Sequence, residues 1–116
     1  MLKLFANGDY VPVRVGKFPA GEVYVKVENV QQVVYPHRRV SIEWQFQGSD
    51  SVIELAMLTN ALYEDCGDLQ ITLYCPYFPG ARQDRVMEEG EAFGLRVYAD
   101  IIKGLGFKTI VTQDLH

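Results

Sequence analysis

The stretch VSIEWQFQGSDSVIELAMLTNALYEDCGDLQITLYCP, residues 40–76, decides the fold that we expect. It opens with near-alternating apolar and polar residues, the pattern of a half-buried strand. From Ser49 the apolar residues recur at spacings of three and four, which predicts an amphipathic helix to about Glu64. Residues 69–75 then form an apolar run of strand length, which Pro76 ends because proline cannot donate to a sheet ladder. The stretch therefore predicts a strand–helix–strand unit.

The carboxyl-terminal part of the chain repeats this alternation. A helical period returns at Glu91 and stops near Gly104 and Gly106, and residues 107–114 have the composition of a last strand. Strands that alternate with helices predict a mostly parallel sheet flanked by helices, hence an α/β fold. Ligands of such sheets bind beyond the carboxyl ends of the strands, so the loops after Cys75 and Thr112 are the first candidate sites.

The amino-terminal portion has a different pattern, rich in strands and turns. Residues 23–27 and 40–46 are the clearest strands, and residues 10–15 form a weaker hairpin arm. This predicts an antiparallel portion that precedes the parallel sheet. Ser51 and Glu54 fit a capping box at the start of the helix.

Composition limits the class of protein. With 116 residues, 48% hydrophobic and 22% charged, the chain has the size and balance of one soluble domain. A net charge of -4 argues against nucleic acid and membrane surfaces as partners. No apolar segment is long enough to span a bilayer and the start does not resemble a signal peptide, so we expect a cytoplasmic protein. Cys66 and Cys75 are expected to be reduced, partly buried thiols.

Two short basic clusters interrupt the dispersed charge: residues 37–39 (HRR), and Arg82 with Arg85. Clusters of this size suit the phosphates of a nucleotide, although a solvated turn is the alternative for the first. The second lies in CPYFPGARQDR, residues 75–85, which combines aromatic rings, arginine and glutamine after a buried strand. Such a mixture can stack on a base and bind phosphate oxygens. An ordinary polar surface loop is equally compatible with the spacing.

The order of residues in this loop resembles a known family. Pro-Tyr-Phe-x-x-Ala-Arg-Gln-Asp-Arg looks like the signature loop of ribose-phosphate pyrophosphokinases, which make phosphoribosyl pyrophosphate from ATP and ribose 5-phosphate. Three further segments are similar to the same family: residues 54–62 (ELAMLTNAL), 99–107 (ADIIKGLGF) and 111–116 (VTQDLH). Residues 17–22 (KFPAGE) resemble the family's Phe-x-Asp-Gly-Glu loop. The fold implied is the phosphoribosyltransferase-like amino-terminal domain of that family.

The resemblance implies roles for particular residues. In the family the upstream loop crosses a subunit interface to hold the adenine of ATP, which implies a homo-oligomer with a shared site. The ATP-binding positions that match are Phe18, Ala20, Gly21, Glu22, Arg82, Gln83 and Asp84. The Asp-Leu-His segment implies that Asp114 and His116 are associated with Mg2+, with His116 acting directly or through water. No residue of this chain is assigned a catalytic role.

The chain departs from the family pattern in three places. Ala20 replaces the usual aspartate, and the helix between the first strand and the upstream loop is expected to be absent. The segment 86–91 (VMEEGE) is acidic where the family has basic residues. Without the resemblance, Phe18 would be interpreted as a hydrophobic residue that caps the core under a turn.

The expected function follows from the resemblance. The chain is interpreted as residues 1–116 of a single amino-terminal domain, the ATP-binding half of a ribose-phosphate diphosphokinase whose carboxy-terminal catalytic half is absent. The implied reaction transfers pyrophosphate from Mg-ATP to ribose 5-phosphate and releases AMP. We expect the isolated chain to bind nucleotide weakly at most, without turnover. The alternatives are a non-catalytic regulatory or assembly subunit, and a pyrophosphokinase with another ribose 5-phosphate-containing acceptor.

Overall fold

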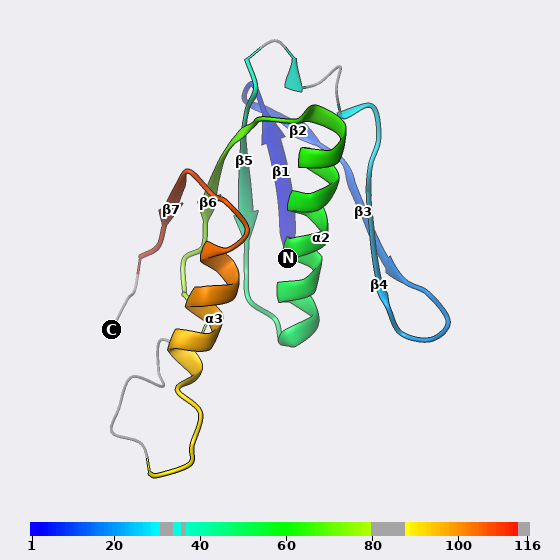
Figure 1. Cartoon of the computed structure of the whole chain (residues 1–116). Coiled ribbons are helices and arrows are strands. Elements are labelled where there is room, and N and C mark those ends of the chain that lie inside the picture. The colour runs from blue at the N-terminus through cyan, green and yellow to red at the C-terminus, as the bar shows by residue number, and fades with distance from the viewer. Residues whose placement is uncertain (31–33, 36, 80–87, 114–116) are drawn as a thin grey trace.

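A computed structural model describes residues 1–30, 34–35, 37–79 and 88–113. Two helices and seven strands are defined in these ranges (Figure 1). In chain order they are β1 (Leu2–Ala6), β2 (Asp9–Val11), β3 (Val13–Lys17), β4 (Val23–Val27), β5 (Arg39–Trp44), α2 (Ser49–Cys66), β6 (Gln70–Tyr74), α3 (Gly94–Lys103) and β7 (Thr109–Val111).

The main sheet has the strand order β2-β1-β5-β6-β7. Strands β5, β6 and β7 are parallel, whereas β1 is antiparallel to both β2 and β5. Strands β3 and β4 form a separate antiparallel sheet of two strands. The expected α/β class, with a parallel sheet and an antiparallel amino-terminal portion, is thereby confirmed.

The reversal between β1 and β2 follows from the turn that joins them. Asn7 and Gly8 both have positive φ, 54° and 83°, which is the backbone conformation of a tight two-residue hairpin turn. A parallel connection needs a crossover of a dozen or more residues, and residues 7–22 form turns and short strands instead. The expected absence of a helix between the first strand and the upstream loop is therefore confirmed.

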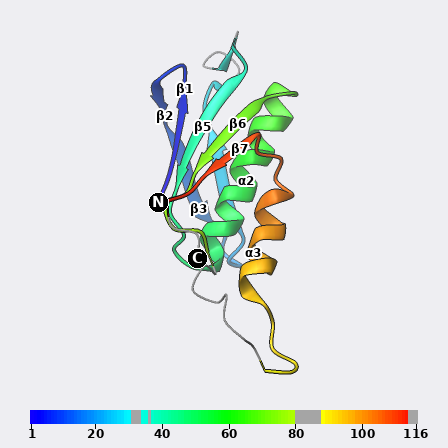
Figure 2. The same ribbon diagram turned by 90° about the vertical axis from the view of Figure 1, so that its left-hand side faces the viewer.

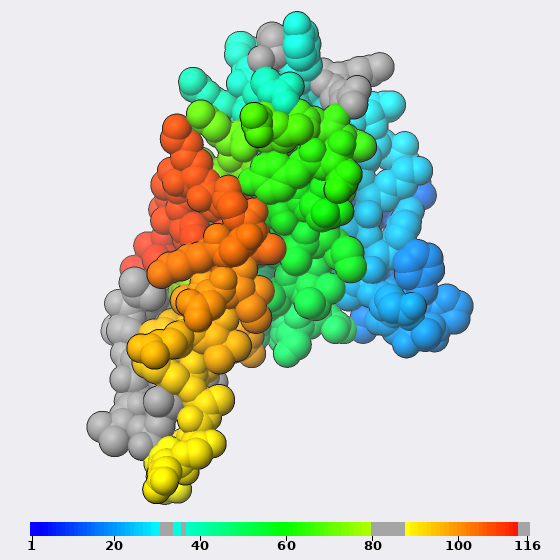
Figure 3. Space-filling view, in the orientation of Figure 1, coloured from blue at the N-terminus to red at the C-terminus, as the bar shows by residue number. Residues whose placement is uncertain are grey.

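Both helices cover the same face of the main sheet (Figure 2). Right-handed crossovers from β5 to β6 and from β6 to β7 advance in the same direction across the sheet, so α2 and α3 fall on one side. The β3–β4 hairpin packs beside α2 on this side, and Figure 3 shows the outer surface that these elements form together. None of the described helices is long and apolar enough to cross a membrane.

The core lies between this face of the sheet and the helices. Apolar side chains at every second strand position point into it, and all of the following are less than 6% exposed: Leu4, Ala6, Val11, Val40, Ile42, Trp44, Ile71 and Leu73. The helix α2 contributes a buried stripe that includes Leu55, Leu58 and Leu62. The alternation that predicted half-buried strands therefore corresponds to one buried face and one open face.

Several predicted boundaries need correction. The capping box is wrong, because α2 begins at Ser49 after Gly48, and Ser51 lies inside the first turn, where its hydroxyl donates to the Gly48 carbonyl at 2.6 Å. The expected arm at residues 10–15 is two strands that separate at Pro12 and pair with different partners. Helix α3 begins at Gly94 rather than Glu91, and β7 is shorter than predicted.

Candidate functional site

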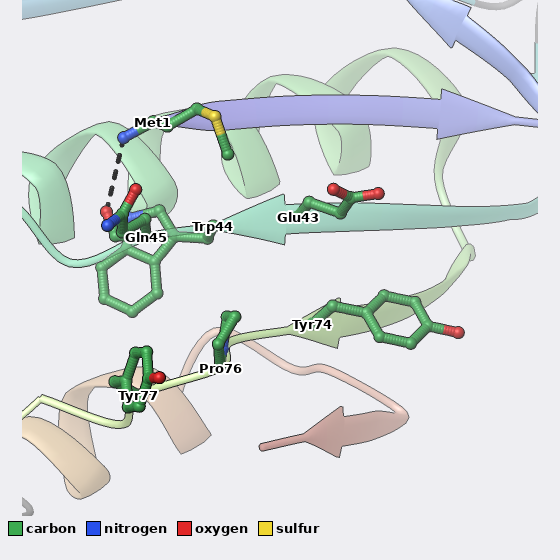
Figure 4. Close-up of a pocket in the computed structure, with 7 residues that line it drawn as sticks. All are labelled: Met1, Glu43, Trp44, Gln45, Tyr74, Pro76 and Tyr77. Atoms are coloured by element: carbon green, nitrogen blue, oxygen red, sulfur yellow. Dashed lines mark hydrogen bonds between the residues drawn. The ribbon is translucent and has the colours of Figure 1, made fainter. Parts of the chain in front are cut away.

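A hollow of about 380 Å³ lies where the parallel strands β5 and β6 end (Figure 4). Its volume is within the range of small-molecule sites. The wall is mainly aromatic and aliphatic, with one carboxylate at its edge. The lining residues are Met1, Glu43, Trp44, Gln45, Tyr74, Pro76 and Tyr77. An apolar wall with a few polar groups suits a flat heterocycle better than a bare phosphate.

Trp44 is fixed at the back of this hollow by two contacts. As the last residue of β5 it is 1% exposed, and its indole Nε1 donates to the carbonyl oxygen of Ser51 at 3.0 Å. Its ring also meets the Phe46 ring edge-on, with centroids 6.2 Å apart. The hydrogen bond ties the end of β5 to the first turn of α2 and fixes the position of the Trp44 ring.

The exits of β6 and β7 are bonded to each other beside the hollow. The Cys75 amide donates to the Val111 carbonyl at 2.8 Å. The Thr112 hydroxyl and the Gln113 amide both donate to the Pro76 carbonyl, at 3.3 and 3.1 Å. The polypeptide therefore leaves two neighbouring strands at one point, and each exit leads directly into a segment that resembles the family motifs.

Five of the predicted site residues lie outside the described ranges: Arg82, Gln83 and Asp84 in the loop after β6, and Asp114 and His116 after β7. Their geometry is accordingly still a prediction. Within the described ranges no group of three or more His, Cys, Asp or Glu side chains could hold a metal ion.

The thiol of Cys75 sits at the same exit but has no role as a nucleophile. The side chain is 1% exposed, and its Sγ donates to the Tyr77 carbonyl at 3.4 Å. Burial raises the pKa of this thiol to about 11, so it is protonated at neutral pH. Cys66 is also free and buried, so the expected free thiols are confirmed, and both are buried rather than partly buried.

The upstream loop forms the tip of the β3–β4 hairpin. The Phe18 amide donates to the Glu22 carbonyl at 2.9 Å and the Gly21 amide to the Phe18 carbonyl at 2.8 Å. Gly21 has φ +99°, a conformation that suits glycine, whereas Ala20 is an exposed turn residue. The Phe18 side chain is 51% exposed and contacts the Tyr24 ring edge-on, with centroids 5.5 Å apart. The alternative interpretation of Phe18 as a cap on the core is therefore wrong.

An ion pair holds this hairpin against the helical layer. Lys17 Nζ lies 2.5 Å from Asp50 Oδ2, and this hydrogen bond raises the pKa of Lys17. In Figure 1 the hairpin tip lies on the opposite side of α2 from the exits of β6 and β7. A single chain therefore does not bring the hairpin tip together with the exits of β6 and β7.

The basic segment at residues 37–39 is used in part for structure. The Arg38 guanidinium donates to the backbone carbonyls of Cys66 and Asp68, the latter at 2.8 Å. These oxygens belong to the end of α2 and the residues after it, where carbonyl groups lack helical partners. The interpretation of this cluster as a turn is supported, and the Arg38 side chain connects this turn to the end of α2.

Sequence reasoning did not single out five residues of the hollow: Met1, Glu43, Trp44, Gln45 and Tyr74. A usable signal was present for two of them, since Glu43 and Tyr74 occupy open-face positions in alternating strands and are Cα partners in the parallel register. Their proximity depends on which strands are neighbours. Strand order is a tertiary property that the alternation alone does not contain.

The fold and the site define a mixed α/β domain whose candidate site lies at the carboxyl ends of parallel strands. Comparison with known protein families identifies the family to which this domain belongs. The family model described as the N-terminal domain of ribose phosphate pyrophosphokinase matches residues 6–106. The chain belongs to this family, as the motifs predicted.

Individual relatives agree with this assignment. The ribose-phosphate pyrophosphokinase of Methanothermobacter thermautotrophicus is 30% identical over 113 residues, a match that covers 90% of this chain and 35% of the relative. The enzyme of the same name from Pyrococcus abyssi is 31% identical over 112 residues, covering 95% and 36%. The crystal structure of phosphoribosylpyrophosphate synthetase from Mycobacterium smegmatis matches with a TM-score of 0.69 and 26% identity, covering 91% and 35%. The chain thus spans about a third of the length of these relatives.

Proposed function

We propose that this domain supplies the ATP-binding part of a ribose-phosphate diphosphokinase. The reaction would transfer the pyrophosphoryl group of Mg-ATP to ribose 5-phosphate, giving phosphoribosyl pyrophosphate and AMP. Family membership supports the class of enzyme, while the role in ATP binding is the part that we infer. A cytoplasmic location, expected from the sequence, is part of this proposal.

One observation carries the proposal: the exits of β6 and β7 are hydrogen-bonded to each other next to an aromatic hollow. The Pro76 carbonyl accepts from both Thr112 and Gln113. The segments that follow contain the Arg82-Gln83-Asp84 triplet on one side and the Asp114-Leu115-His116 triplet on the other. The two segments that would bind phosphate and a cation therefore start from adjacent backbone positions.

Each side chain would contribute through charge and position. Arg82 would bind phosphate oxygens through its planar guanidinium, and the amide of Gln83 can donate to phosphate or pair with a base. Asp84 would orient the arginine side chains. Phosphoryl transfer depends mainly on positioning and on neutralising charge, so these residues need no covalent role.

The donor set is compatible with magnesium. Mg2+ is usually bound through one or two carboxylates together with substrate phosphates and water. Asp114 would supply such a carboxylate, with His116 acting through a bound water. Mg2+ would there neutralise charge on the phosphate oxygens.

The hairpin tip would complete the site from a second subunit. Phe18 is half exposed, and its tip lies far from the exits of β6 and β7 in the same chain (Figure 1). An exposed ring on a projecting hairpin, with Glu22 at the same tip, can reach a neighbouring molecule and stack on a nucleotide base. The proposal therefore includes a homo-oligomer with a site shared between subunits.

Titration with Mg-ATP tests this proposal without requiring turnover. Trp44 is the only tryptophan and lines the hollow, so its fluorescence reports on binding nearby. We expect saturable binding by calorimetry and a change in Trp44 fluorescence, both weakened at least tenfold by Arg82→Ala, the loss of one charge-assisted hydrogen bond. Arg96→Ala, which removes an exposed arginine on α3, is the control and should have no effect.

The outcomes separate the proposal from its alternatives. Binding that is equally strong in wild type and Arg82→Ala would refute the assignment of the loop. No binding to this chain, alone or mixed with the remaining part of an active relative, would favour the non-catalytic alternative.

A further inference from the structure

The tip of the β3–β4 hairpin is closed by a tight turn (Figure 1). The Gly21 amide donates to the Phe18 carbonyl at 2.8 Å, and the Phe18 amide donates to the Glu22 carbonyl at 2.9 Å. Pro19 occupies the second position of this turn, where the proline ring already holds the φ angle that a turn requires. Gly21 follows with a φ of +99°, which glycine adopts without strain. Local bonds therefore define the backbone on both sides of Phe18.

The register of the hairpin divides its side chains between two faces. Lys17 is the Cα partner of Val23, and Gly16 is the Cα partner of Tyr24. Val23 is 6% exposed and β4 packs against α2, so Lys17 shares the face toward α2 and Tyr24 belongs to the outer face. In the described part of the chain nothing lies within 4 Å of a Cβ added at Gly16. The space across the hairpin from Tyr24 is therefore free for its ring.

On the outer face, Tyr24 contacts the ring of Phe18. The two ring centroids are 5.5 Å apart and the ring planes meet at 74°, which is the T-shaped arrangement that aromatic pairs prefer. Phe18 is nevertheless 51% exposed, so this contact orients its ring without covering it. A ring that is held on one side and exposed on the other can stack on a further flat ring.

On the inner face, Lys17 connects the residue before Phe18 to the start of α2. Its Nζ lies 2.5 Å from Asp50 Oδ2, in the first turn of the helix, where the helix dipole favours a carboxylate. The hydrogen bond to Asp50, and the negative charges of Asp50 and Glu54, raise the pKa of Lys17. Both partners of the ion pair are more than half exposed, so the pair adds little to folding stability. A bias of a few fold is still enough to favour one orientation of the tip.

We propose that the residues around Phe18 are positioning residues, which hold its ring ready to stack on a nucleotide base. Tyr24 sets the orientation of the ring, and the Lys17–Asp50 pair sets the direction in which the tip projects from α2. This inference rests on the proposed function, in which the tip holds the adenine of ATP. A preorganised side chain raises affinity because less conformational freedom is lost on binding. The three residues therefore act on the affinity for the base and not on the affinity for the phosphates.

Nuclear magnetic resonance of the nucleotide-free chain tests the orientation directly. Three-bond couplings to Cγ of Phe18 report its χ1 rotamer, and we expect one dominant rotamer in the wild type. Tyr24→Leu keeps an apolar side chain but removes the ring, so Phe18 should then average over more than one rotamer. The heteronuclear NOE of the Gly21 amide should equal that of the β5 amides in the wild type and fall in Asp50→Asn. Asp50→Glu retains the carboxylate and should keep the wild-type value.

Two matched controls lie away from the tip. Tyr10→Leu removes an exposed ring that contacts Phe5 edge-on, with centroids 5.9 Å apart, in the β1–β2 hairpin. Glu28→Gln removes a carboxylate that lies 3.7 Å from both Arg14 and Lys26, at the opposite end of the β3–β4 hairpin. Neither control should change the signals of the tip. Equal changes in the controls, or unchanged signals in the tip variants, would overturn the proposal.

Calorimetry with Mg-ATP and with magnesium tripolyphosphate separates the base from the phosphates. Tyr24→Leu and Asp50→Asn should each weaken Mg-ATP binding about three- to fivefold and leave tripolyphosphate binding unchanged. Wild-type affinity for Mg-ATP in both variants, with a loss in Phe18→Ala, would contradict the positioning role. No Mg-ATP binding by the wild type, or no effect of Phe18→Ala, would instead refute the proposed function, and the resonance comparison would still decide whether Tyr24 and Asp50 orient Phe18.

Discussion

Replacing Trp44 by phenylalanine tests how much the buried contacts of this side chain, at the back of the hollow, contribute to the stability of the domain. The substitution removes the buried hydrogen bond from Nε1 to the Ser51 carbonyl, which is 3.0 Å long. Loss of a bond of this kind costs about 1 kcal/mol. The phenyl ring also buries roughly 40 Å² less apolar surface, worth about 1 kcal/mol at 25 cal/mol per Å². We therefore expect the free energy of unfolding to fall by about 2 kcal/mol.

The assay is urea unfolding followed by far-ultraviolet circular dichroism, because the variant contains no tryptophan. Tyr77→Phe is a matched control: Tyr77 lines the same hollow but is 66% exposed, so the change should stay within about 0.5 kcal/mol. Benzothienylalanine at position 44 keeps the fused rings and lacks the N–H, and should cost only about 1 kcal/mol. A loss below about 0.5 kcal/mol for Trp44→Phe, or an equal loss in the control, would refute the reasoning.

Two further predictions concern the packing of the domain at its two ends. Gly106 has φ +84°, and an added Cβ would lie 3.2 Å from the Tyr63 hydroxyl, so Gly106→Ala should lower the free energy of unfolding by about 1–2 kcal/mol. Gly16→Ala, where nothing lies within 4 Å and φ is not positive, should change it far less in the same urea assay. Burial raises the pKa of Cys75 from 9.0 to about 11, so the unfolded chain loses this proton first as the pH rises. The resulting stability is complete below pH 9 and should fall by about 2 kcal/mol between pH 9 and 11, and by less in Cys75→Ala. Equal pH dependence in both proteins would contradict this.

The sequence alone determined the local elements. The change of period at Ser49 located α2, the alternation in residues 40–46 located β5, and the run before Pro76 located β6. These features depend on neighbours within a few residues, because helical and strand periods follow from backbone geometry. The capping box was wrong because the helix begins earlier than it requires, with Gly48 as its N-cap, so that the Ser51 hydroxyl donates to the Gly48 carbonyl and accepts from the Gln47 amide.

The motifs also predicted the family, which the comparison confirmed. That prediction needed the order of residues in CPYFPGARQDR, since spacing alone left an ordinary surface loop open. The individual ligands in this loop and after β7 lie outside the described ranges, so their roles stay predictions.

Only the tertiary structure decided where these elements meet. Strand order placed Glu43 beside Tyr74 and made the Pro76 carbonyl accept from Thr112 and Gln113, which brings the two motif exits together. It also set the direction of β1 and left one face of the sheet open. Such contacts join residues far apart in the chain, and their free energy depends on the packing of the whole domain. A one-dimensional pattern specifies which face of a strand is apolar, but not which strand will lie beside it.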